Sequence, residues 1–133
     1  MNKIISFLEK NHIFTLATSF NDAPYCAPLF YVFDKERMAL IFASNPDTRH
    51  IAQALANPFA SGAIYTQTLE VAKIQGLQFT GVVKEALKGQ KAIYLKRFPY
   101  AAAMDTSFWQ MELGWIKMTD NTLGFKTKLI WSR

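Results

Sequence analysis

A stretch of alternating side chains followed by a tight turn is the feature of the first third of the chain that most constrains its fold. From Ile13 to Phe20 the alternation has the period of a β-strand, with Phe14 and Leu16 on one face. Asn21–Pro24 has the composition of a tight turn, and Tyr25–Phe33 predicts a second, strongly apolar strand. Strands joined by so short a turn form a hairpin, which restricts this part of the chain to an antiparallel sheet.

Turn residues and apolar stretches follow one another along the rest of the chain. Asp34–Arg37 predicts another tight turn, and Met38–Ala43 predicts a third strand. Further strands are expected over Phe59–Thr66, Val71–Leu87, Phe108–Met118 and Leu123–Trp131, with turns at Gln67–Glu70 and Thr119–Thr122. Short helices are expected over Asn2–Asn11, Asp47–Ala56 and Lys88–Phe98, while Tyr100–Asp105 fits either a loop or a helix. The fold class is therefore mainly β with short helices, a small antiparallel barrel filling one domain over residues 1–133.

Composition narrows the classes of partner. Half of the 133 residues are hydrophobic, which is typical of a globular chain. Phenylalanine contributes eleven residues, a surplus that suits a large barrel interior or an interface between subunits. The net charge of +5 favours anionic ligands, but the chain has no Lys/Arg-rich run. Nucleic-acid binding by a basic barrel surface with exposed aromatic residues is therefore only a third, weaker hypothesis.

One cysteine and two histidines give little support for a metal site. Cys26 stands alone, and His12 and His50 lie far apart in the sequence, so we expect no bound metal. Cys26 falls in an apolar stretch and is interpreted as a small core residue.

The first residues lack the pattern of a signal peptide, and no apolar run is long enough to span a membrane. We therefore expect a cytoplasmic protein.

Cationic residues at the expected start of the second helix are the strongest functional signal. Thr48, Arg49 and His50 fall in or beside the first turn, where unpaired N–H groups and the macrodipole already create positive charge. Acidic side chains normally collect there, and a local rule broken in this way often marks a functional site. An external anion, above all a phosphate, would restore the balance. The Thr48 hydroxyl, the helix amides and the paired donors of Arg49 would hold it.

Asp47 offers an alternative explanation of the same residues. Its carboxylate lies two positions before Arg49 and can neutralise the guanidinium at the surface without any ligand. On these residues alone this second explanation is the stronger one, because short motifs often match by chance.

Pro28 interrupts the apolar second strand, and proline cannot donate a hydrogen bond to a neighbouring strand. It predicts an edge strand, which would leave backbone groups of Leu29 and Phe30 free to meet a planar heterocycle. A plain edge strand without a ligand is the simpler interpretation. In the long strand, Gly76 and Gly81 predict a bulge, a bend or a close approach by another segment.

The sequence contains no recognisable catalytic constellation. It shows no catalytic triad, no paired carboxylates and no glycine-rich phosphate loop. Gln75 and Gln78 are polar amides in an otherwise apolar strand, where they need partners from the protein, water or a ligand. If the protein carries out a reaction, a cofactor supplies the reactive group and the chain supplies position and electrostatics.

The order of these features resembles the FMN-binding split-barrel family, to which pyridoxamine 5′-phosphate oxidase belongs. Within that family the chain looks most like a small group of uncharacterised bacterial proteins. Four segments carry this closer resemblance: Leu16–Ser19, Pro28–Tyr31, Thr48–His50 and Ile74–Gly76. The resemblance as a whole spans nearly the entire chain. The resemblance implies an antiparallel split β-barrel of the FMN-binding type.

The resemblance also assigns roles to particular residues. It implies that Leu29, Phe30 and Ser44 contribute to the flavin pocket, and that Thr48, Arg49 and His50 hold the FMN phosphate. A family glutamine falls close to Gln75. Members are homodimers with flavin at the subunit interface, and a late tryptophan can reach the flavin from the partner subunit, a role for which Trp115 is the candidate.

Departures from the oxidase pattern argue against pyridoxamine phosphate as the substrate. His50 replaces a permanent cation by a side chain that is mostly neutral at pH 7. Tyr25 and Cys26 stand where the oxidases have a basic residue, and the oxidases' basic C-terminal signature is absent.

We expect an FMN-dependent oxidoreductase or flavin reductase acting on a small molecule that the sequence does not name, with no catalytic residue assigned. The alternative is a binding module that carries or senses a flavin, haem or another anionic ligand without turnover.

Overall fold

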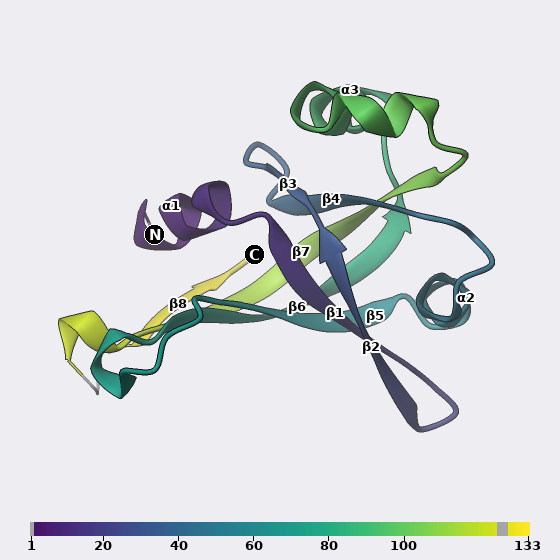
Figure 1. Ribbon diagram of the computed structural model, residues 1–133. Helices are drawn as coiled ribbons and strands as arrows, with labels where there is room; N and C mark the ends of the chain where they lie inside the picture. The colour runs from purple at the N-terminus through teal and green to yellow at the C-terminus, as the bar shows by residue number, and fades with distance from the viewer. Residues whose placement is uncertain (1, 125–127) are drawn as a thin grey trace.

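The computed structural model describes residues 2–124 and 128–133, which form one antiparallel sheet with three α-helices packed on it (Figure 1). The strands are β1 (Ile13–Phe20), β2 (Ala23–Phe30), β3 (Val32–Asp34), β4 (Ala39–Ser44), β5 (Phe59–Tyr65), β6 (Gln75–Glu85), β7 (Ser107–Asp120) and β8 (Lys128–Ser132). The α-helices are α1 (Asn2–Lys10), α2 (Arg49–Ala56) and α3 (Lys88–Arg97). Three 3₁₀ helices are η1 (Val71–Lys73), η2 (Pro99–Ala103) and η3 (Asn121–Leu123).

The strand order makes the sheet curl on itself. The hydrogen-bonded order is β2-β1-β5-β6-β7-β4-β3, and β8 pairs with β7 outside this path. Strands β2 and β3 lie at opposite ends of that order, yet only Tyr31 separates them in the sequence. The two ends of the sheet must therefore meet, which produces the expected antiparallel split barrel.

The predicted hairpins are confirmed. Asn21 and Asp22 form a two-residue turn with φ values of 50° and 63°, the geometry of a type I′ turn, and they join Phe20 to its partner Ala23. Strand β2 is an edge strand that pairs only with β1 among the described strands, as Pro28 predicted.

The side chains of β4 alternate between two hydrophobic clusters. Leu40 and Phe42 enter the main core, which fills the inside of the curled sheet and also takes apolar side chains from α1 and α2. Ile41 points to the other side and packs with Tyr94 of α3 and Ala101 of η2. Strand β4 thus holds α3 and η2 against the outside of the barrel, and the first residues after β4 lead into α2.

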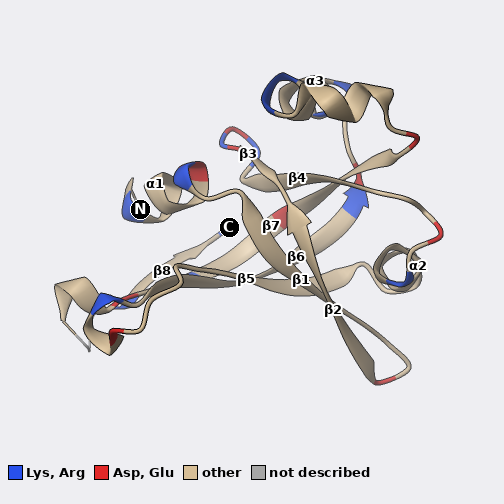
Figure 2. Ribbon diagram, viewed as in Figure 1, with Lys and Arg blue, Asp and Glu red and all other residues tan. Residues whose placement is uncertain are grey.

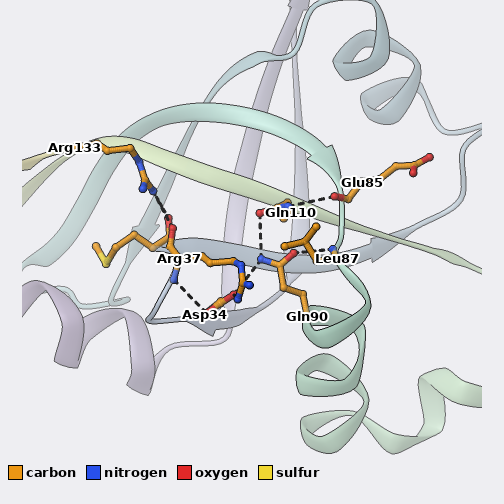
Figure 3. A network of polar contacts seen from close by, with 8 residues as sticks. Asp34, Arg37, Glu85, Leu87, Gln90, Gln110 and Arg133 are labelled. Atoms are coloured by element: carbon orange, nitrogen blue, oxygen red, sulfur yellow. Dashed lines mark hydrogen bonds and ion pairs between the residues drawn. The ribbon is translucent and has the colours of Figure 1, made fainter.

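A buried polar network fixes α3 to the sheet (Figure 3). Nε2 of Gln90 donates to Oδ2 of Asp34 at 3.0 Å and to Oε1 of Gln110 at 3.1 Å. Oε1 of Gln90 accepts from the backbone N–H of Leu87 at 2.9 Å, which caps the start of α3. Gln90 is fully buried, and every buried side-chain polar atom of the described residues has a partner.

Several predicted strands have different limits from those expected. The strand predicted over Val71–Leu87 begins only at Gln75, because Val71–Lys73 forms a 3₁₀ helix. The strand predicted over Tyr25–Phe33 breaks at Tyr31, whose hydroxyl donates to the backbone oxygen of Leu8 at 2.8 Å.

At the C-terminal end, Leu123 belongs to η3 and strand β8 begins at Lys128. The part of this prediction that covers residues 125–127 lies outside the described residues. Strand β7 continues to Asp120, into the segment predicted as a turn.

Cys26 is exposed, so its interpretation as a core residue is wrong. On β2 the side chain of Ala27 is buried and that of Cys26 points the opposite way, because neighbouring residues of a strand face opposite sides.

The bulge or close approach predicted at Gly81 is confirmed. The register between β6 and β7 shifts at Thr80/Gly81, and a Cβ on Gly81 would collide with the backbone of Glu112.

Candidate functional site

Several hydrogen bonds fix the loop between β4 and α2. Oγ of Ser44, the last residue of β4, lies 2.7 Å from Nε2 of His50, and Oγ1 of Thr48 lies 3.4 Å from the same nitrogen. The Thr48 hydroxyl donates to the backbone oxygen of Asn45 at 2.8 Å. Nε1 of Trp109 donates to the backbone oxygen of Ser44 at 2.9 Å. Three of the expected site residues thus meet here, because Ser44 and Thr48 both lie beside the imidazole nitrogen of His50.

His50 is buried, with 9% of its surface exposed. Burial lowers the pKa of its imidazole below the ordinary value, so the ring is neutral at pH 7. Its Nε2 is engaged with Ser44 and Thr48, whereas the sequence assigned His50 to the phosphate. That assignment stays a prediction, and the observed contacts show a side chain that fastens the helix start to the end of β4.

Arg49 is exposed and lies over an aromatic ring. Its Cζ is 4.3 Å from the centroid of the Tyr25 ring, on β2. Within the described ranges, no carboxylate lies within ion-pair distance of Arg49, so the surface pair with Asp47 is not formed. Figure 2 shows Lys and Arg on all three helices, so the cation of α2 is not part of a single basic face.

The start of α2 has no side-chain cap. Thr48 stands at the N-cap position with extended backbone, but its hydroxyl bonds to Asn45 rather than to a helix amide. The first helical amide with an intrahelical partner is that of Ala52, which donates to the oxygen of Thr48 at 3.0 Å. The amides of the first turn therefore remain available to an acceptor from outside the helix.

A pocket of about 600 Å³ opens beside this loop. One side consists of Pro28–Phe30 from β2, and the other consists of Ala43–Asn45 at the end of β4. Its remaining wall comes from α3, η2 and the segment that follows, with Tyr94, Tyr100, Ala101, Met104, Asp105 and Thr106. The pocket has the size of a typical cofactor site, and it gathers the expected residues Leu29, Phe30 and Ser44.

Aromatic rings back one wall of this pocket. Phe30 lies 5.7 Å from Phe98 between ring centroids, and Phe98 lies 5.1 Å from Tyr94 and 6.1 Å from Tyr100. Phe30 and Tyr100 are exposed. A wall of this kind favours a flat apolar ring system.

Gln75 and Trp115 lie elsewhere in the same chain. Gln75 begins β6, and its Nε2 donates to Oδ2 of Asp120 at 3.1 Å. The end of β6 nearest the pocket is Glu85, about 30 Å further along the strand. Trp115 lies on β7 and helps to line a separate depression of about 410 Å³ on the side of the sheet away from the main core. Neither residue lines the pocket beside Ser44.

The sequence did not identify the pocket wall formed by η2 and the residues after it. Tyr100, Met104 and Asp105 fall in the segment that fitted either loop or helix, and no motif there signals a ligand. Trp109 was also missed, because its bond to Ser44 depends on the pairing of β4 with β7.

Within the described ranges, no group of three His, Cys, Asp or Glu side chains could hold a metal ion. None of the described helices is long and apolar enough to cross a membrane.

Solved structures share this fold, and three of them illustrate the match. A NimC/NimA family protein from Clostridium acetobutylicum has a TM-score of 0.73 at 23% identity, and the match covers 100% of this chain and 92% of that one. An FAD-binding protein from Mesorhizobium loti has a TM-score of 0.73 at 15% identity, covering 88% and 91%. HutZ, the haem storage protein of Vibrio cholerae, has a TM-score of 0.70 at 16% identity, covering 84% and 88%.

Sequence comparison identifies the family. A UPF0306 protein from Photorhabdus laumondii is 42% identical over 132 residues, which cover 96% of this chain and 92% of that protein. The pyridoxamine 5′-phosphate oxidase profile matches residues 2–119. The resemblance inferred from the sequence is thereby confirmed, and the chain belongs to the pyridoxamine 5′-phosphate oxidase family, within its UPF0306 group.

Proposed function

We propose that this protein binds FMN in the pocket between β2, β4 and η2 and uses it as a flavin-dependent oxidoreductase or flavin reductase. The substrate would be a small molecule that the chain does not identify.

One observation carries the proposal. The pocket has an aromatic wall, and at Ser44–Asn45 it adjoins the uncapped, cationic start of α2. Such a site suits a ligand with a flat apolar ring system and an anionic tail, which describes FMN. The first-turn amides and the guanidinium of Arg49 are unused donors, so the residues present fit the phosphate group.

Each residue at the site has a distinct task in this proposal. Arg49 and the first-turn amides of α2 bind the phosphate, and the Thr48 hydroxyl lies beside them. His50, neutral at pH 7, holds Ser44 and so keeps the helix start next to the pocket. Bound FMN would supply the redox chemistry, while the chain orients it and shields one face from water.

We also propose that two copies assemble with the flavin at their interface. The side of the sheet away from the main core is lined by small residues, including Ala17, Ser61 and Thr80, with the partly exposed Trp115 among them. Phe59 at the rim of this face is 70% exposed. A partner subunit covering this face would bury these apolar groups. In such a dimer Trp115 of one subunit could reach a flavin held by the other subunit.

A carrier or sensor without turnover is the second candidate. Among the residues that the structure describes, Asp105 is the only carboxylate that lines the pocket, so these residues form no acid–base pair of the kind that many enzymes use. Binding without catalysis would need nothing more than the residues described. A similar fold is found in a haem storage protein, so haem is the alternative ligand.

The first test is to identify the ligand that copurifies with the protein. The protein is purified in the dark and then denatured to release its ligand. The ligand is identified by chromatography and by its absorbance spectrum. FMN supports the proposal, and haem would overturn it. FMN-loaded protein is then mixed with NADH or NADPH under anaerobic conditions. Bleaching of the flavin faster than that of free FMN supports the oxidoreductase, whereas the rate of free FMN supports the carrier.

A further inference from the structure

The contact between Arg49 and Tyr25 joins the start of α2 to strand β2, which also forms one side of the pocket. Tyr25 lies three residues before Pro28, about 10 Å along the strand. The guanidinium carbon is 4.3 Å from the centre of the ring, within the range of a cation–π contact.

A guanidinium at this distance can lie with its face over the ring, and its edges then stay free. The five N–H groups lie in the plane of the cation, and a phosphate binds along that edge. Among the described residues, no acceptor or carboxylate bonds to the guanidinium of Arg49. The ring therefore holds the side chain without using the donors that an anion needs.

An exposed arginine normally samples many rotamers, and an anion must restrict them when it binds. A cation already stacked on an aromatic ring has lost part of that freedom before binding. Its position also depends on the ring alone, because the tyrosine hydroxyl takes no part in the stacking.

We propose that Tyr25 is a positioning residue that holds Arg49 ready for the phosphate and so favours FMN over riboflavin. This inference rests on the proposed function. It assigns part of the preference for FMN to Tyr25, which stands where the oxidases have a basic residue.

The test is a set of binding titrations with FMN and with riboflavin, which lacks the phosphate. The proteins are the wild type, Tyr25→Leu, Tyr25→Phe, Arg49→Ala and the double variant Tyr25→Leu/Arg49→Ala. We expect Tyr25→Leu to weaken FMN binding about two- to five-fold and to leave riboflavin binding unchanged. Tyr25→Phe keeps the ring and should bind FMN as the wild type does. In the Arg49→Ala background, Tyr25→Leu should cause no further loss.

Three results would overturn the inference: an unchanged FMN affinity in Tyr25→Leu, an equal loss for riboflavin, or an undiminished loss in the absence of Arg49. Any of these, together with a wild type that prefers FMN, rejects the role of Tyr25 and leaves the proposed function standing. A wild type that binds neither flavin rejects both. Thermal unfolding of each variant shows whether it is folded. If Tyr25→Leu unfolds, Tyr25→Gln, which also lacks the aromatic ring, replaces it in the same titrations with the same expected and overturning results.

Discussion

Nε2 of His50 and Oγ of Ser44 share a hydrogen bond of 2.7 Å, which joins the first turn of α2 to the last residue of β4. Ser44 is also held from the other side, because Nε1 of Trp109 donates to its backbone oxygen. The position of the helix start relative to the pocket therefore depends on a buried imidazole rather than on a flexible surface loop.

Replacing His50 should change how stability depends on pH. Burial lowers the pKa of His50, so between that pKa and about 6.5 the unfolded chain binds a proton that the folded chain does not. The contribution of His50 to stability is thus fully present above pH 6.5 and decreases as the pH falls through this window. We expect the wild type to lose more unfolding free energy than His50→Gln when the pH is lowered from 7.5 to 5.5. Urea unfolding at both pH values, at one protein concentration, measures the difference.

Gln67→Leu, at an exposed position without a titratable side chain, serves as the control and should follow the wild type at both pH values. Parallel losses in the wild type and in His50→Gln would show that His50 titrates equally in the folded and unfolded chains.

Gln90→Leu should destabilise the protein by about 2–4 kcal/mol, because it removes the neutral donor to a buried carboxylate and the cap of α3. Arg37, with Nη1 at 3.7 Å from Oδ2 of Asp34, remains as a more exposed partner. Gln67→Leu, at an exposed position in the loop after β5, should change stability by less than about 0.5 kcal/mol. Denaturant unfolding of both variants measures the two effects, and equal losses would mean that the network adds no net stability.

Ala63→Arg should prevent dimerisation. Ala63 lies on the small-residue face of the sheet, where a long charged side chain would obstruct a second copy. We expect the wild type to sediment as a dimer and Ala63→Arg as a folded monomer. Ala92→Arg introduces the same side chain on the exposed surface of α3 and should leave the dimer intact. A wild type that remains monomeric at high micromolar concentration would contradict the proposed assembly.

Local patterns predicted the parts of the fold that depend on neighbouring residues. The period-two alternation located β1, and the turn residues Asn21 and Asp22 adopt the positive φ values that a short hairpin requires. Pro28 predicted an edge strand for the same kind of reason, because its missing N–H is a property of the residue itself.

Contacts between distant segments were not predictable in this way. Cys26 was assigned to the core because its stretch is apolar, but only the register with β1 decides that its side chain is exposed. The partner of Arg49 is similar: Asp47 is the near neighbour, yet the ring of Tyr25, 24 residues earlier, is the one that contacts the guanidinium. The wall at Tyr100 arises from the packing of η2 on β4, which leaves no pattern in the sequence.

The most direct test of the central claim is a titration of ligand-free protein with FMN and with riboflavin, followed by flavin fluorescence, in the wild type, Arg49→Ala and Lys128→Ala. Lys128 is an exposed cation on β8, so its variant controls for the loss of one positive charge. We predict that the wild type binds FMN more tightly than riboflavin. Arg49→Ala should weaken FMN binding by about 2–3 kcal/mol and leave riboflavin nearly unchanged, because the lost bonds are charge-assisted bonds to the phosphate. Lys128→Ala should match the wild type. Equal affinities of the wild type for both flavins, or equal losses for both in Arg49→Ala, would contradict a phosphate site at the start of α2.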